Sequence, residues 1–338
     1  MKLAALLTLV LPFAAAFPTA MMAKRQENVS ETVASGIEEH GPLPEGTKTF
    51  EGGTALDIDE YPESVEAALN GTRAEVLSLA VRDPTSAEMD DLEFHTALAA
   101  NVYCSAVMRG TWICPHCSKT RHLDIVETFS TLLYDTNALV ARDDSEQVIY
   151  VVFRGSSSIQ NWMANLNVIL ANYPGALGAR VHAGFYNSYQ DVQSRLMSLV
   201  RSQVSSHSGY AVHVTGHSLG GALALFHALD LYENGITNVR LITQGQPRVG
   251  NTAFANYVVN TGIPYMRAVN QRDVVPHIPD LGYTHSGEEF WESTGLFGGV
   301  QVCPNGIETD DCANSIAPFT SFLDHTSYFG MTVGLCLL

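Results

Sequence analysis

Tyr210–Leu229 reads YAVHVTGHSLGGALALFHAL, and this stretch predicts a strand, a sharp turn and a helix in direct succession. Its first part, up to Thr215, is rich in β-branched residues, and its last part is a run of alanine and leucine. Between them, Gly216-His217-Ser218-Leu219-Gly220 fits the G-x-S-x-G pattern of a nucleophile elbow. Side chains at either glycine would collide as the strand and helix close, so the pattern indicates that Ser218 stands on a strained turn. An idle serine on a glycine-rich turn is the alternative.

A serine hydroxyl is a weak nucleophile until a base removes its proton, and that base needs an acid to fix its tautomer. In chains with this elbow the acid follows the serine and the histidine comes last. We favour Asp273 over a turn-residue interpretation, because it directly follows the predicted strand Met266–Val269, at the edge where catalytic groups collect. The candidate bases are His277, His285 and His325. Chain order does not separate the last two.

Strand-like and helix-like segments alternate after residue 76. Strands are predicted at Val148–Phe153, Ala211–Thr215, Leu241–Thr243 and Met266–Val269. Helices are predicted at Ala87–Val107, Gln190–Val204 and Gly220–Tyr232. This alternation favours one α/β domain over residues 76–338, with a mostly parallel central sheet covered by helices.

The first 75 residues differ from the rest. Lys2, an apolar run over residues 3–13 and the small residues 14–16 predict a secretory signal peptide, assigned to residues 1–20. Residues 21–75 are acidic, rich in proline and glycine, and carry a dibasic pair at Lys24-Arg25 and glycosylation sequons at Asn28 and Asn70. We interpret them as a propeptide, the alternative being a linker kept on a secreted mature enzyme.

Composition excludes several classes of protein. A formal net charge of −17 is unsuited to nucleic acid, and no later apolar stretch is long enough for a transmembrane helix. Six cysteines in an exported chain predict three disulfides, with fifteen pairings open. A redox pair or half a zinc site at Cys114-Pro115-His116-Cys117 fits poorly, because no βαβ unit precedes it and no second CxxC exists. We therefore expect no metal and no cofactor.

The chain from about residue 76 resembles the fungal class 3 lipases of the Rhizomucor type. The matching segments are Phe153–Ser158, Gly216–Gly221, Gln244–Gly250, Asp273–His277, Gly287–Trp291 and Asp324–Gly330. The resemblance implies an α/β-hydrolase-type fold with a short helical lid, and it selects His325 as the base. It implies an oxyanion hole built from the backbone N–H groups of Ser156 and Leu219, where the sequence alone leaves a plain polar turn equally open at Ser156. It also implies the disulfides Cys104–Cys336, Cys114–Cys117 and Cys303–Cys312.

The lid falls on the segment that follows the oxyanion loop. Ile159, Trp162, Met163 and Leu166 have helical spacing and would form one apolar face over about two turns. A permanently buried core helix is the alternative. The chain departs from its relatives at two positions. Relatives often carry a basic residue at the position of Gln160, and they usually carry an acidic one at the position of Asn165. Charge pairs that would hold an open lid are therefore not expected here.

Three functions follow from these patterns. The favoured one is a secreted, monomeric triacylglycerol lipase that acts on lipid at oil–water interfaces. A soluble feruloyl or acetyl-xylan esterase on the same fold is the alternative. Trp162 and Met163 argue against it, because polar residues would serve a soluble esterase better at these positions. A catalytically dead binding protein is disfavoured by the complete set Ser218, Asp273 and His325.

Overall fold

The computed structural model describes residues 81–336, apart from residues 165, 167, 294–297 and 305, and the backbone of two N-terminal strands. Those strands, β1 (Thr47–Phe50) and β2 (Gly53–Leu56), form an antiparallel hairpin. The chain divides into two compact units, Met1–Glu75 and Val76–Leu338. The predicted signal peptide and, apart from this hairpin, the predicted propeptide lie outside the described residues.

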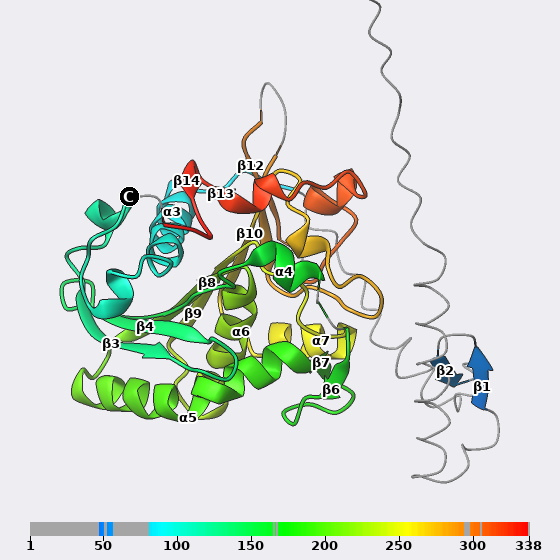
Figure 1. Ribbon diagram of the computed structural model, residues 1–338, viewed down its shortest axis with the longest axis horizontal. Helices are drawn as coiled ribbons and strands as arrows, with labels where there is room; N and C mark the ends of the chain where they lie inside the picture. Colours follow the sequence, from blue (N-terminus) through cyan, green and yellow to red (C-terminus); the bar gives the residue numbers. More distant parts are fainter. Residues whose placement is uncertain are drawn as a thin grey trace, which may run out of the picture. The chain divides into compact units, whose positions relative to one another are not determined.

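The second unit is built on an eight-stranded sheet (Figure 1). Its strands, in spatial order, are β12 (Val300–Cys303), β11 (Glu288–Glu292), β10 (Tyr265–Asn270), β9 (Val239–Gln244), β8 (Ala211–His217), β5 (Val148–Phe153), β4 (Asn137–Asp143) and β3 (Asp124–Ser130). The five strands β5, β8, β9, β10 and β11 run parallel, whereas β4 and the two edge strands β3 and β12 are antiparallel to their neighbours. The carboxyl ends of the parallel strands therefore meet at one edge, which we call the catalytic edge.

Helices cover both faces of this sheet. The α-helices of the described part are α3 (Ser86–Asn101), α4 (Ile159–Ala164), α5 (Ala183–Ser206), α6 (Leu219–Glu233) and α7 (Thr252–Asn260). On one face, Val212 and Val214 of β8 share a core cluster with residues of α5 and α6. On the other, α3 packs through Leu92 against Ile242 of β9. Because both faces are buried, β5 is a continuous run of six buried residues.

Small elements complete the unit. Two antiparallel strand pairs join β6 (Leu170–Asn172) to β7 (Arg180–His182) and β13 (Ser327–Tyr328) to β14 (Met331–Thr332). The 3₁₀ helices are η2 (Val107–Arg109), η3 (Cys117–Lys119), η4 (Val275–His277), η5 (Cys312–Ile316) and η6 (Leu323–Thr326). None of the helices in the described part of the chain is long and apolar enough to span a membrane.

The predicted strands are confirmed, and two helix boundaries are corrected. α3 ends at Asn101 rather than at Val107, because the buried Asn101 side chain donates a hydrogen bond to Thr120 Oγ1 and the chain turns away. α5 begins at Ala183, seven residues before the predicted start at Gln190. Its N-cap is His182, whose Nδ1 accepts a hydrogen bond from the Phe185 N–H, and histidine is not a usual capping residue.

The six cysteines form three disulfides. Cys104 is bonded to Cys336, Cys114 to Cys117 and Cys303 to Cys312. This is the pairing that the resemblance implies. The first disulfide joins the end of α3 to the C-terminal segment, so it closes nearly the whole second unit into one covalent loop.

Candidate active site

Ser218 sits where β8 turns into α6. Its φ of 60° and ψ of −133° lie in a region that side chains rarely adopt, which is the strain that the elbow pattern predicts. The flanking glycines make the turn possible. A Cβ at Gly216 would lie 2.4 Å from the carbonyl of Gly220, and a Cβ at Gly220 would lie 2.4 Å from the Phe153 oxygen. Leu219 is the first residue of α6, so its N–H has no partner within the helix.

An acid–base pair lies at the same edge of the sheet. His325 Nδ1 donates a hydrogen bond to Asp273 Oδ2 over 2.7 Å. The loop after β10 carries Asp273, and η6 carries His325. The Val275 N–H donates to Asp273 Oδ1 over 2.8 Å, and the Tyr328 hydroxyl donates to Oδ2. Burial, and the charge of Asp273 next to it, raise the pKa of Tyr328 well above its ordinary value, so this hydroxyl keeps its proton and acts as a donor.

The three groups of the predicted triad are inaccessible to solvent. Ser218, Asp273 and His325 are each 0% exposed, so no substrate can reach Ser218 in this conformation. Ser218 Oγ and His325 Nε2 are both buried, and neither has a hydrogen-bond partner among the described residues. A catalytic hydrogen bond that forms only once substrate is bound is common in enzymes without ligand. Access to the serine therefore requires part of the chain to move.

The other two histidines have different surroundings. His285 is buried and donates from Nε2 to the Pro276 carbonyl over 2.7 Å. Its burial, followed by the charge of Arg267, lowers its pKa well below the ordinary value. His277 ends the short helix η4, and its backbone carbonyl accepts a hydrogen bond from Arg248. Of the three candidate bases, His325 is the one whose ring contacts Asp273.

The loop after β5 meets the elbow at a small cavity of 190 Å³. Ser156 and Leu219, the two predicted oxyanion donors, both line it. So does Trp162 of α4, which ties the predicted lid to this cavity. Tyr134–Thr136, from the turn between β3 and β4, also line it. The cavity therefore borders the place where an ester carbonyl would have to lie.

The short helix α4 begins three residues after Ser156. It spans six residues, shorter than the two turns predicted to Leu166. Ile159 is buried, while Trp162 and Met163 are half-buried. The Trp162 ring stacks on Phe185 of α5, with the ring centroids 5.8 Å apart and the planes at 25°. Asn165 and the side chain of Gln160 lie outside the described part, so the departures from the lid pattern have no structural description.

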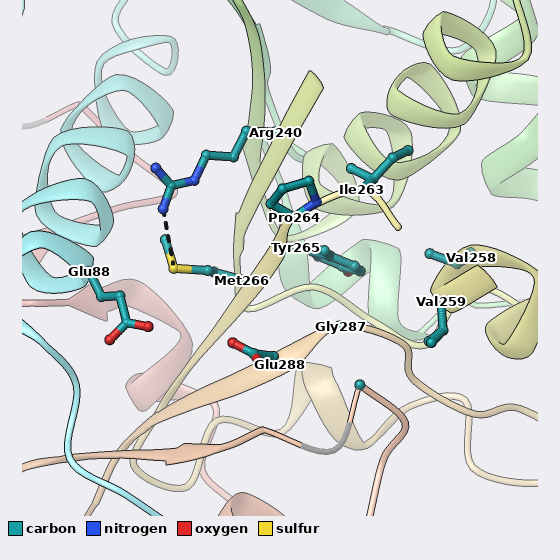
Figure 2. Close-up of a pocket in the computed structure, with 11 residues that line it drawn as sticks. Glu88, Arg240, Val258, Val259, Ile263, Pro264, Tyr265, Met266, Gly287 and Glu288 are labelled. Carbon is teal, nitrogen blue, oxygen red and sulfur yellow. Dashed lines mark hydrogen bonds between the residues drawn. The ribbon is translucent and has the colours of Figure 1, made fainter. Parts of the chain in front are cut away.

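A larger cavity, of 330 Å³, lies away from this chemistry (Figure 2). It is lined at the starts of β9, β10 and β11, which is the edge opposite to the catalytic one. Figure 2 shows Glu88, Arg240 and Glu288 on one side and the valines of α7 on the other. None of the three predicted triad residues lines it. Among the described residues, no cluster of histidine, cysteine and acidic side chains could hold a metal ion.

Several residues at the site had no role predicted for them. Tyr328 and Gly245 lie within matching segments, but no sequence pattern marks a tyrosine or glycine that contacts the acid–base pair. Tyr103 and His217 form hydrogen bonds around the elbow, and the search for a nucleophile, a base and an acid does not point to either of them. For His217 the one signal in the sequence is its place directly before Ser218, and Tyr103 has none.

The fold and the site define an α/β-hydrolase with a serine elbow. Comparison with known proteins gives the family. The sequence model described as Lipase (class 3) matches residues 150–283. The chain is 51% identical to a lipase of Rhizomucor miehei over 91% of this chain and 85% of that protein. The chain belongs to the class 3 lipases.

Two solved structures extend the comparison. A triacylglycerol lipase whose catalytic centre is formed by a serine protease triad is 54% identical to this chain. It superposes with a TM-score of 0.74 over 76% of this chain and all of that one. The Rhizomucor miehei lipase propeptide complex is 50% identical, with a TM-score of 0.74 over 90% of this chain and 94% of that chain.

Proposed function

We propose that this protein is a secreted triacylglycerol lipase, with Ser218 as nucleophile, His325 as general base and Asp273 as the acid that orients it. The observation that carries this proposal is the buried Asp273–His325 hydrogen bond beside a strained serine elbow. The relative with a serine protease triad supports the same chemistry. Secretion is supported by the predicted signal peptide and by the three disulfides.

In this mechanism Ser218 Oγ attacks the ester carbonyl and His325 Nε2 takes up its proton. The tetrahedral intermediate then expels the alcohol, which receives that proton from His325. Water, deprotonated by the same nitrogen, releases the fatty acid from the acyl-enzyme. Asp273 keeps Nδ1 protonated throughout, and its other hydrogen bonds, from Val275 and Tyr328, hold the carboxylate in place.

The intermediate places a negative charge on the former carbonyl oxygen. The backbone N–H groups of Ser156 and Leu219 are the proposed donors, assisted by the Ser156 hydroxyl. Both residues line the 190 Å³ cavity beside Ser218, and the N-terminus of α6 adds the positive end of its dipole. Removing one donor from such a site typically costs about a hundredfold or more in kcat.

A lipid substrate is favoured by apolar side chains at the catalytic edge. Leu132 and Leu133 are 104% and 75% exposed in the turn between β3 and β4. Ala138 pairs with Phe153 across antiparallel strands, so this turn lies beside the carboxyl end of β5. Phe319 and Leu323, both 76% exposed, precede His325 in the chain. Exposed apolar groups of this kind are typical of a surface that meets lipid.

The helix α4 is the proposed lid. In the present conformation Ile159 is buried, Trp162 and Met163 are half-buried, and Ser218 is inaccessible. Opening it would expose apolar area at about 25 cal/mol per Å², a cost that an oil surface removes. An oil surface should therefore shift the population toward the open form. A soluble esterase gains nothing from this arrangement, which is why it remains the second candidate.

The test is a rate profile on a short-chain triglyceride through its solubility limit. The wild type should show a sharp rise in rate once droplets form. Replacing Ile159, Trp162 and Met163 together with Ser should flatten that rise and spare the hydrolysis of dissolved esters. Ser218→Ala should lower kcat by several orders of magnitude on both. A smooth saturation curve in the wild type would favour the esterase, and more than a few per cent of activity in Ser218→Ala would refute the triad.

A further inference from the structure

A continuous hydrogen-bonded path joins the three loops of the proposed site. The Gly155 N–H, one residue before Ser156, donates to the Tyr103 hydroxyl over 3.1 Å. Tyr103 and His217 Nδ1 are 2.9 Å apart. His217 Nε2 lies 2.9 Å from the backbone oxygen of His325. The path therefore runs from the oxyanion loop, through the residue before the nucleophile, to the backbone of the proposed base.

The direction of each hydrogen bond follows from the chemistry of its atoms. The His325 carbonyl can only accept, so His217 Nε2 carries the proton and Nδ1 is an acceptor. Because Nδ1 has no proton, the Tyr103 hydroxyl donates its one proton to Nδ1, and its oxygen accepts from the Gly155 N–H. Burial raises the pKa of Tyr103 and lowers the pKa of His217 well below its ordinary value, so both groups stay neutral. With the His217 proton on Nε2, every donor and acceptor atom of the path has a hydrogen-bond partner.

Packing leaves the path little room to rearrange. His217 is 0% exposed, and its ring lies 4.4 Å from that of His325, centroid to centroid. A Cβ at Gly155 would lie 2.4 Å from the Tyr103 oxygen and 2.9 Å from Ser218 Cβ. A Cβ at Gly334 would meet both His217 Cε1, at 3.5 Å, and Ile159 Cδ1, at 3.1 Å. The His217 ring therefore lies against the base and near the start of the proposed lid.

We propose that Tyr103 and His217 are positioning residues that set the oxyanion loop and the base relative to Ser218. Neither touches the reacting atoms in this proposal, which rests on the proposed function. Tyr103 fixes the loop through Gly155, while His217 fixes His325 through its carbonyl oxygen. An error of about 1 Å in such a constellation costs roughly a hundredfold in rate. Loss of either side chain should therefore lower the rate of the chemical step, and so kcat, and should change substrate binding much less.

The experiment measures kcat and KM on a dissolved ester for Tyr103→Phe, His217→Leu and the double variant, together with inhibition by a boronic acid. Each single variant should lose roughly ten- to a hundredfold in kcat with KM unchanged within about twofold. The double variant should be no worse than the poorer single one, because both break one path. Boronic acid affinity should fall by the same factor as kcat/KM. His217→Gln, which keeps an acceptor and a donor, should recover much of the rate.

The matched control is Tyr189→Phe. Tyr189 is buried, its hydroxyl donates a hydrogen bond to Asp230, and the same oxygen lies 3.3 Å from His227 Nδ1. Tyr189→Phe therefore removes a buried tyrosine hydroxyl and its hydrogen bonds away from the proposed site. It should keep full kcat even if its Tm falls. Unchanged kcat in folded Tyr103→Phe, additive losses in the double variant, or losses that follow Tm alone would overturn the proposal. Ser218→Ala, assayed in parallel, shows separately whether the proposed function itself has failed.

Discussion

At the scale of single residues, the proposed site depends on a glycine beneath the acid–base pair. Gly245 has a φ of 56°, and a Cβ there would lie 2.8 Å from both His325 Cε1 and the Tyr328 oxygen. It would also lie 2.9 Å from Asp273 Oδ2. Added carbon at this point has to push the imidazole or the carboxylate out of place, and both are fully buried.

We therefore expect Gly245→Ala to lower kcat on a dissolved ester by about a hundredfold. The control is Gly262→Ala, whose φ of 70° imposes similar backbone strain but which has no atom within 4 Å of the new Cβ. It should lose about 1 kcal/mol of stability and keep its kcat. Equal kcat in the two variants would mean that strain, not displacement of the pair, accounts for any loss.

These residues mark the limit of what the sequence predicts. Ser218 was predictable because its elbow combines a local pattern with a strand and a helix on either side. Asp273 followed from its place after a predicted strand. His325 and His285 could not be separated by chain order, because the difference lies in which ring reaches Asp273 across 52 residues of chain. Contacts such as Tyr328 with Asp273 have no local signal at all.

At the scale of elements, β11 and the turn after β13 meet at a half-buried carboxyl group, that of Glu292. Glu292, the last residue of β11, accepts hydrogen bonds from the Phe329 N–H over 3.0 Å to each oxygen. Burial raises its pKa from 4.5 to about 7, against the opposing effect of that N–H. Phe329 follows the strand that contains Tyr328, so this carboxyl group holds the turn behind the acid–base pair.

The sign of the pH dependence follows from linkage. Between pH 4.5 and about 7 the folded protein keeps the Glu292 proton that the unfolded chain has lost. Stability should therefore fall as pH rises through this window and level off above it. Glu292→Gln keeps an acceptor for Phe329 and cannot ionise. Its Tm relative to wild type should rise between pH 4.5 and 8 in thermal unfolding, and an unchanged difference across this range would contradict the prediction.

The central elements were predictable and the edge elements were not. β5 and β10 are buried along their whole length, and β8 and β9 along most of it, so each contains a short group of β-branched or other apolar residues that marks a strand. β3 shows only one buried residue in seven, and β12 two in four, so neither has the continuous apolar signal of a central strand. Their place is set by pairing with neighbours far along the chain, which no local pattern contains.

At the scale of the whole molecule, one disulfide closes the second compact unit, and the proposed removal of the propeptide would leave this unit as the mature enzyme. The Cys104–Cys336 disulfide spans 232 residues, and chain-entropy arithmetic gives it about 5 kcal/mol before any strain is subtracted. Near the start of this unit, Arg82 pairs with the backbone of Val302 in β12 and forms an ion pair of 2.6 Å with Glu88. These contacts extend the sheet edge and anchor α3, so a folded enzyme should retain them.

We therefore predict that the secreted enzyme begins at about residues 70–78. A cut there lies at the division between the two compact units and leaves Arg82 and α3 intact. The relative solved as a propeptide complex supports a removable N-terminal segment. N-terminal sequencing and the intact mass of the secreted protein measure the start directly. A start between residues 17 and 30 would refute the propeptide and leave the acidic segment as a linker. A start beyond Arg82 would mean that its contacts with Val302 and Glu88 are dispensable.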